Sequence, residues 1–176
     1  MNEIDWDALE TIALEEFHDA AFTSLSDEYV PGEGDHEIIP RAMIIGEAPG
    51  AQEQIKRRPF VGQAGRILRD LMSIAGLQTV PYTAEVTSTG FAIDKRSVEV
   101  DANCWLTNTV KFRPPGNRKP TPAEVSAARP YLLREWQAIG KPRVIVLVGG
   151  TALFAITGKE QSILRAAGKM HLARSK

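Results

Sequence analysis

The chain has 176 residues, 43% hydrophobic and 24% charged, which is an ordinary composition for one globular domain. No apolar run reaches the roughly 20 residues of a membrane-spanning helix, and no basic start precedes an apolar core, so we expect no membrane segment, no secretory signal and a cytoplasmic location. The single cysteine, Cys104, excludes an internal disulfide, and the three histidines are too far apart to predict a metal site.

The net charge of −1 is unevenly distributed along the chain. Residues 1–40 contain 12 Asp or Glu and no Lys or Arg, whereas residues 105–176 contain 13 Lys or Arg and three acids. A basic half indicates a polyanionic partner such as DNA. The alternative is that the acidic start folds against the basic end and neutralises it. Charge alone leaves both interpretations open.

The first half of the chain contains three recognisable elements. Residues 4–17 have hydrophobic side chains at helical spacing and acids on the other face, which predicts an amphipathic helix. After a loop over 24–34, the short apolar run 42–45 is typical of a buried strand. Residues 62–75 predict a second helix, with Gly76 well placed to end it.

The segment 78–103 mixes strand-favouring runs with turn signals, and we interpret it as an inserted hairpin or excursion. Thr121, Pro122 and Glu124 form a capping box with proline at the first helical position, which predicts a helix start. The later elements are, in order, a strand over 105–112, a proline-rich loop over 114–122, a helix to about residue 139, a buried strand over 144–148 and a short helix over 150–156.

Strands and helices therefore alternate along the chain. This order predicts an α/β fold of three layers, α/β/α, with a central, mostly parallel sheet in a single domain over 1–176 that carries the insertion 78–103. Ligands of such sheets bind beyond the carboxyl ends of the strands. The loops expected there are 46–59, 111–122 and 149–151.

The turn after the first strand is the first candidate site. It consists of Gly46, Glu47, Ala48, Pro49 and Gly50. Glycine allows a ligand to approach the backbone closely, and proline stiffens the turn. The Glu47 carboxylate can polarise a water molecule or hold the proton of a ring nitrogen. A purely structural turn with a solvated glutamate is the alternative.

Two further residues fit a pocket for a nucleic-acid base. Phe60, at the start of a helix beside this turn, can stack on a base, although an ordinary core phenylalanine is the alternative. Asn108 lies on an otherwise apolar strand, and its amide can pair with a pyrimidine edge or instead satisfy neighbouring backbone groups. With these partners, we interpret residues 46–65 as one wall of a base-binding pocket.

A rigid, basic loop follows Asn108 in the chain. Its candidate DNA-binding residues are Lys111, Arg113, Asn117, Arg118 and Lys119. Cations and amides beside a pocket are suited to the phosphate backbone of DNA. A solvated surface loop is the alternative.

Two long motifs, GEAPGAQEQIKRRPFVGQAGRIL and TNTVKFRPPGNRKPTPAE, together resemble the uracil-DNA glycosylase superfamily. They are most similar to its fourth, thermostable family, whose pattern is a GEAPG turn, an acidic residue, PFVG-x-AG-x-LL and then TN-x-VK-x-RPP-x-NR-x-P-x-P-x-E. The resemblance covers roughly residues 30–162, apart from 78–103.

This resemblance implies an enzyme that hydrolyses the bond between uracil and deoxyribose after the base leaves the helix of single- or double-stranded DNA. A monofunctional enzyme fits, because no lysine occupies a clear Schiff-base position. Glu47 would position water or stabilise a cationic sugar. Phe60 would stack on the uracil, and Asn108 would read its edge and help to reject cytosine. Glu53 matches the family's acidic position behind the turn.

The chain departs from the fourth family at its cofactor. That family binds a four-iron, four-sulfur cluster through four cysteines, two of which fall at Phe112 and Ala128 here, and no cysteine precedes the VPGEG segment. We therefore expect no cofactor. Packing of Phe112, Ala128 and the acidic N-terminal helix is our hypothesis for what fills the space.

The second departure concerns the family's His-Pro-Ser loop, whose histidine approaches the uracil carbonyl. This sequence has no His-Pro-Ser, and His171 comes too early. A compact variant without the histidine, a protein partner that supplies or replaces the part, a truncated chain and weak activity all stay open. The competing interpretation is a weak or inactive glycosylase-fold protein that binds DNA as an accessory factor. A nucleotide-binding protein is disfavoured, because the chain has no phosphate-binding loop.

Overall fold

A computed structural model of the chain describes residues 28–35, 38–77 and 103–170. The helix expected over 4–17, nearly all of the expected insertion 78–103 and His171 lie outside these residues. In the part that is described, no helix combines the length and apolarity that crossing a membrane requires.

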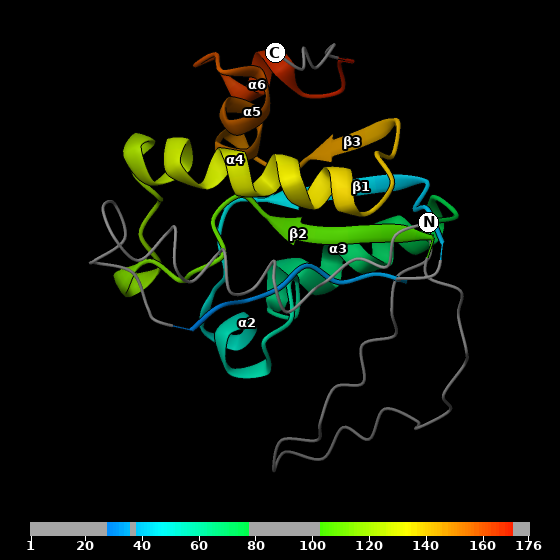
Figure 1. Cartoon of the computed structure of the whole chain (residues 1–176), viewed down its shortest axis with the longest axis horizontal. Coiled ribbons are helices and arrows are strands. Elements are labelled where there is room, and N and C mark those ends of the chain that lie inside the picture. The colour runs from blue at the N-terminus through cyan, green and yellow to red at the C-terminus, as the bar shows by residue number, and fades with distance from the viewer. Residues whose placement is uncertain (1–27, 36–37, 78–102, 171–176) are drawn as a thin grey trace.

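A three-stranded parallel sheet forms the centre of the described structure (Figure 1). Strand β1 (Ala42–Gly46) lies in the middle, between β2 (Cys104–Asn108) and β3 (Val144–Leu147). The register pairs Gly46 with Asn108, so β1 and β2 end side by side. The expectation of a mostly parallel sheet is confirmed for the described strands.

Helices cover both faces of this sheet, as expected for a three-layer fold (Figure 1). Met43 and Ile45 of β1 belong to the larger hydrophobic core, which includes residues of α4 (Pro122–Ala138) and α5 (Gly150–Thr157). Ala42 and Ile44 point to the opposite face and share a second core with α3 (Gln63–Ile74). The alternation of side chains along a buried central strand thus produces the two layers of helices.

Local signals in the sequence set the ends of the helices as predicted. At the start of α4, the Thr121 hydroxyl accepts a hydrogen bond from the Glu124 backbone N–H at 3.2 Å, and the Glu124 carboxylate accepts one from the Thr121 N–H at 2.6 Å. Helix α3 ends beside Gly76, whose φ of 71° lies in the left-handed region that glycine adopts readily. Both predicted helix ends are confirmed.

Several local expectations need correction. The loop expected over 46–59 contains the short helix α2 (Ala51–Lys56), and α6 (Ile163–Ala166) and the 3₁₀ turn Pro115–Asn117 were also not predicted. Strand β2 ends at Asn108, four residues earlier than expected.

The third strand was expected to be buried, yet Val144 is 53% and Val146 37% exposed. The smaller core places α3 over Ala42, Ile44 and Leu106, which belong to β1 and β2. Among the described residues, β3 therefore lies at the edge of the sheet and beyond the cover of α3. A run of apolar residues cannot distinguish such an edge strand from a central one.

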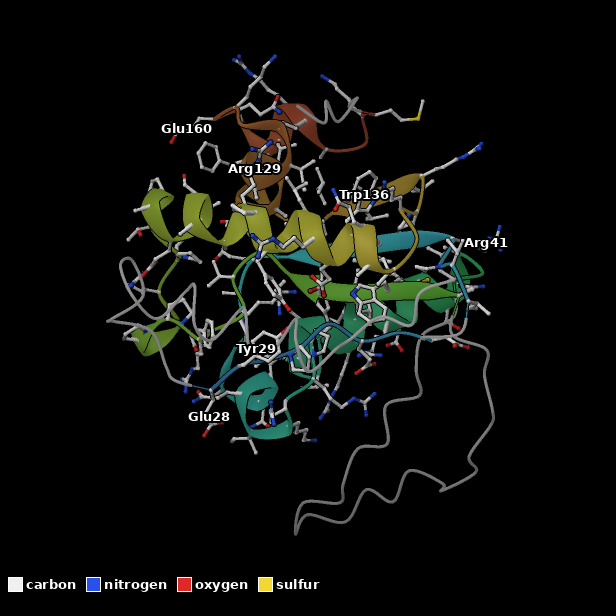
Figure 2. The ribbon with its side chains drawn as sticks, in the orientation of Figure 1. Glu28, Tyr29, Arg41, Arg129, Trp136 and Glu160 are labelled. Atoms are coloured by element: carbon white, nitrogen blue, oxygen red, sulfur yellow. The ribbon has the colours of Figure 1, made fainter. Side chains whose placement is uncertain are left out.

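The antiparallel segment 28–35 runs along the outer side of β2 (Figure 1). Isolated bridges pair Glu33 with Leu106 and Tyr29 with Phe112. Tyr29, which Figure 2 shows on this segment, packs edge-on against Tyr131 of α4 and shares a hydrogen bond between the two hydroxyl groups. The segment therefore connects β2 to the helix layer.

A buried ion pair lies between the sheet and α4. Lys111 is fully buried, and its Nζ lies 2.6 Å from Oε2 of Glu135, which is 2% exposed. The other oxygen of Glu135 accepts hydrogen bonds from Trp105 Nε1 and Thr107 Oγ1, both at 3.0 Å. Burial lowers the pKa of Lys111, and the Glu135 charge counteracts that effect.

Removing one partner of this pair leaves the other charge buried and uncompensated. We expect Glu135→Leu to lower the free energy of unfolding by about 3–5 kcal/mol, and the double variant Lys111→Met/Glu135→Leu to be more stable than Glu135→Leu alone. Urea denaturation measures both, with Glu160→Leu at an exposed position as the control. A double variant less stable than Glu135→Leu would contradict this account.

Candidate active site

The side chains of Asn108 and Phe60 meet over the backbone of Gly46. A Cβ atom added to Gly46 would lie 2.4 Å from Asn108 Oδ1 and 2.7 Å from Phe60 Cζ. Such distances are too short for any side chain other than hydrogen without displacement of a neighbour. The structure thus brings together three residues that the sequence placed in one pocket, and it does so at the carboxyl ends of β1 and β2.

Asn108 offers hydrogen-bonding capacity that its neighbours do not fill. The residue is 5% exposed, and none of the described residues forms a hydrogen bond with its side-chain amide. No buried side-chain nitrogen or oxygen of the described residues lacks a hydrogen-bond partner, so the amide atoms of Asn108 are still reached by solvent, which a ligand can replace. An amide held in this way at a strand end is suited to a ligand that supplies both an acceptor and a donor.

The backbone of Phe60 is held in an unusual conformation. Its φ of 55° lies in the left-handed region, which a bulky side chain rarely adopts. Arg69 of α3 donates to the carbonyl of Phe60 at 3.0 Å and to that of Pro59 at 2.9 Å. Gly65 completes the fit, because a Cβ there would lie 2.2 Å from the Phe60 carbonyl carbon. Surrounding residues therefore fix the ring against Gly46.

Glu33 anchors the arginines behind Phe60. Its carboxylate lies 2.9 Å from Arg69 Nη2 and 2.6 Å from Arg58 Nε. Arg69 is only 8% exposed, so the pair with Glu33 offsets the cost of burying its charge. Segment 28–35 thereby supports the position of Phe60, although it lies outside the two sequence motifs that contain the site residues. Nothing in the sequence alone had pointed to a role for Glu33 or Arg69.

Glu53 joins the turn after β1 to the segment that carries Phe60. Its Oε2 accepts a hydrogen bond from the Gly50 N–H at 3.1 Å, and its Oε1 accepts from the Val61 and Gly62 N–H groups at 3.0 and 2.6 Å. One carboxylate on α2 thus satisfies backbone donors of two segments. The sequence indicated an acidic position here, and the structure supplies its physical role.

Glu47 lies between the chain segments that follow β2 and β3. It follows β1 directly, is partly exposed, and its backbone carbonyl accepts from the Val110 N–H at 3.1 Å. Its Oε2 accepts a hydrogen bond from Thr151 Oγ1 at 2.5 Å. Nothing in the sequence assigned Thr151 a role, although the loop 149–151 was expected at this end of the sheet. The only signal for it was that position.

The rest of the turn is more structural. Pro49 is buried, Ala48 packs against the larger core, and Gly50 is the N-cap of α2. Their assignment to substrate binding stays a prediction. What the structure adds is that the turn leads straight into a helix, so its conformation is fixed on both sides.

The basic loop divides into buried and accessible cations. Lys111 was expected to hold a phosphate, and this assignment is wrong in the structure, because the residue is fully buried and paired with Glu135. Arg113 donates to Asn117 Oδ1 at 2.7 Å and to Gln54 Oε1 at 3.2 Å. These two residues, with Lys119, remain at or near the surface and stay candidates for DNA contact.

Arg118 is also partly exposed but has a carboxylate partner. Its Nη2 lies 2.6 Å from Glu124 Oε1, and its side chain is 36% exposed. Hydrogen bonds from Arg118 and Thr121 hold the pKa of Glu124 at about 2, against an ordinary value of 4.5. The pair fixes the basic loop to the start of α4 and leaves part of the guanidinium accessible.

A cavity of about 570 Å³ lies beside Thr151. Its walls come from the basic loop, the starts of α4 and α5 and the segment that joins α5 to α6, where Figure 2 shows Glu160. Figure 2 also shows Arg129 of α4, which donates to the Ala155 carbonyl of α5 at 2.9 Å and so joins two of these walls.

The described residues do not fit an iron–sulfur cluster. Phe112 and Ala128, at two of the expected ligand positions, are 3% and 0% exposed and pack in one core with Tyr29 and Tyr131. Burial raises the pKa of Cys104 to about 11, which disfavours the thiolate that a metal requires. Among these residues, no group of three or more His, Cys, Asp or Glu side chains could hold a metal.

Comparison with known proteins identifies one family. The profile of the family described as "UDG: Uracil DNA glycosylase superfamily" matches residues 31–173. The chain is 36% identical over 121 residues to the type-4 uracil-DNA glycosylase of Archaeoglobus fulgidus, which covers 69% of this chain and 48% of that protein.

Two other type-4 uracil-DNA glycosylases show the same level of similarity. The protein of Thermotoga maritima is 36% identical over 140 residues, or 79% of this chain and 60% of that protein. The protein of Pyrobaculum aerophilum is 37% identical over 133 residues, or 74% and 55%. The chain thus spans roughly half to three-fifths of the length of these relatives.

If Glu53 fixes two segments, removing its carboxylate should loosen both. We expect Glu53→Ala to raise the hydrogen-exchange rates of the Gly50, Val61 and Gly62 amides by roughly tenfold or more, since a hydrogen bond to a charged group contributes about 1.5–3 kcal/mol. NMR-detected exchange measures the effect, with the Ile44 amide in β1 as the internal control. Unchanged rates at all three amides would refute this role.

The Arg118–Glu124 pair predicts a pH dependence of stability. Because the folded-state pKa of Glu124 is about 2 and its ordinary value is 4.5, its contribution is present above pH 4.5 and is lost as the pH falls toward 2. The stability advantage of the wild type over Glu124→Gln should therefore shrink across this interval in urea denaturation. A constant difference would contradict the assignment, and Glu160→Gln serves as an exposed control.

Proposed function

Because the chain belongs to the uracil-DNA glycosylase superfamily, we propose that it hydrolyses the N-glycosidic bond of uracil in DNA. The observation that carries the proposal is the meeting of Asn108 and Phe60 over Gly46, with the Glu47 carboxylate next in the chain. Excision of a base requires a ring that stacks on it, an amide that can hydrogen-bond it and a carboxylate, and these groups come from the ends of neighbouring strands and the segments that follow them. Mere attachment to DNA requires none of them.

The proposed site would favour uracil over cytosine. A base that leaves the duplex presents its pairing edge and one face to the enzyme. The Asn108 amide can donate to the uracil carbonyl O4 and accept from the ring N3–H at the same time. Cytosine presents an amino group and a ring acceptor at those positions, so one orientation of the amide leaves both groups mismatched. The Phe60 ring supplies the stacking surface.

Glu47 is the candidate catalytic residue of this reaction. The bond between C1′ and N1 breaks with its electron pair going to uracil, and positive charge develops on the sugar. Water adds to C1′ and loses one proton, which balances the negative charge of the departing uracil. A fixed carboxylate beside the sugar offsets that charge and orients the water. Lys111 is the lysine of the basic loop that lies closest to Asn108 in sequence. Its buried ion pair with Glu135 supports a monofunctional mechanism, in which no lysine bonds covalently to the sugar.

The proposed partner is DNA, single- or double-stranded. Arg113, Arg118 and Lys119, with Asn117, offer cations and an amide on the loop that follows β2. Phosphate contacts of this kind position the strand and weaken with salt. The Asn117 amide in the loop and the Glu124 carboxylate at the start of α4 hold Arg113 and Arg118 in place before DNA arrives.

The proposal is tested by incubating the protein with oligonucleotides that contain one uracil, in single and double strands, and cleaving abasic sites with alkali. We expect Glu47→Ala to lower uracil release about 10²- to 10⁴-fold, because it removes a charge that acts at the reacting bond. Asn108→Asp should lower uracil release and permit release of cytosine. Asn103→Asp, just before the amino end of the same strand, is the matched control.

Absence of alkali-labile sites with the wild type, while DNA binding persists, would overturn the proposal. That outcome would favour the alternative function, a DNA-binding accessory protein with the glycosylase fold. Equal activity of the wild type and both site variants would instead remove Glu47 and Asn108 from the site.

A further inference from the structure

Thr151, which follows β3, contacts Glu47, which follows the neighbouring strand β1. The proposed reaction gives this contact no role. The Thr151 hydroxyl donates to Glu47 Oε2 at 2.5 Å, although the two residues are 104 positions apart in the chain. Thr151 is 2% exposed and belongs to the first turn of α5. The bond therefore connects the carboxylate after β1 to the helix after β3.

The backbone fixes the place of this hydroxyl. The Val148 N–H donates to the Ile45 carbonyl at 2.9 Å, so the chain after β3 stays paired with the end of β1. Gly149 then turns the chain into α5 with a φ of 98°, a value that glycine adopts readily. Thr151 follows two residues later and has little freedom of position. The pairing of Val148 with β1 and the turn at Gly149 thus place the Thr151 hydroxyl beside Glu47.

The consequence for Glu47 is a carboxylate with one oxygen committed and one available. The Thr151 bond occupies Oε2, and no described residue hydrogen-bonds Oε1. A hydroxyl that donates to one oxygen restricts the rotation of the carboxylate. The other oxygen can then accept a hydrogen bond from the attacking water in a set direction. A displacement of about 1 Å at such a point costs roughly 10²-fold in rate.

We propose that Thr151 is a positioning residue that holds the Glu47 carboxylate in the orientation needed for water attack. The inference rests on the proposed function. Thr151 is also part of the wall of the 570 Å³ cavity between the basic loop and α5, so the contact lies beside open space rather than in the core of the sheet. A role confined to starting α5 would not require a carboxylate from another strand as its acceptor.

The same helix supplies a threonine with a local role. Thr157 Oγ1 donates to the Leu153 carbonyl at 2.7 Å, one turn back within α5. Replacing Thr157 with valine removes a hydroxyl of the same kind from the same helix without touching Glu47. Thr157→Val is therefore the matched control for Thr151→Val, and Thr151→Ser tests the hydroxyl itself.

The test compares these three variants with the wild type in steady-state uracil release from one oligonucleotide. For Thr151→Val we expect kcat to fall about 10- to 100-fold with KM within about twofold, because the hydroxyl acts on the catalytic group rather than on DNA. Thr151→Ser should recover most of kcat, and Thr157→Val should match the wild type. An unchanged kcat in Thr151→Val, or a serine variant as slow as the valine variant, would overturn the inference.

A second measurement needs no activity. If the contact exists in solution, Thr151→Val and Glu47→Ala together should shift the urea midpoint by less than the sum of their single shifts. Additive shifts would overturn the inference even in an active protein. A wild type that releases no uracil would overturn the proposed function and the positioning role of Thr151 together, whereas the midpoints would still report whether the contact forms.

Discussion

The absence of a side chain at Gly46 is the constraint on which the rest of the site depends. Only hydrogen fits between the backbone of β1, the amide of Asn108 and the ring of Phe60, since any Cβ would lie within 3 Å of both. The parallel register places Gly46 opposite Asn108, and the Thr109 N–H and hydroxyl both bond the Gly46 carbonyl, at 2.9 and 2.8 Å. Backbone hydrogen bonds between β1 and the end of β2 thus fix the position of Gly46. The side chains of Asn108 and Phe60 then form the pocket around it.

Two buried ion pairs then hold the segments that carry Phe60 and Asn108. Arg69, paired with Glu33, fixes the segment that carries Phe60, while Lys111, paired with Glu135, fixes the chain just after Asn108. A buried ion pair contributes little net stability, because desolvation of both charges offsets their attraction. What it provides is a penalty for any alternative arrangement that separates the partners. We interpret both pairs as elements that specify geometry at the site.

Sequence reasoning found the residues of the pocket but not the contacts that hold them. Gly46 and Asn108 end two strands and Phe60 lies shortly before α3, and the parallel topology alone brings strand ends together. Lys111 was misassigned to phosphate because a lysine in a basic run gives no sign of burial until the helix carrying Glu135 is placed above it. Thr151 was missed for the same reason, since its acceptor lies 104 residues away in the chain.

The aromatic cluster beside β2 explains how this chain differs from the iron–sulfur family that it resembles. A cluster held by four cysteines, two of them at the positions of Phe112 and Ala128, would join the segment before β1, the chain after β2 and helix α4. Here Tyr29 contacts Phe112 at 5.9 Å between ring centroids and meets Tyr131 edge-on at 6.2 Å, so these three segments are joined by packing. Aromatic pairs contribute about 0.5–1.5 kcal/mol each beyond their burial. Because Lys111 lies 5.4 Å from the Tyr131 ring, the same cluster also reaches the ion pair that fixes the chain after Asn108. Support for the pocket therefore passes through apolar and aromatic contacts around Phe112 and Ala128, the positions at which the resemblance implied two cluster cysteines.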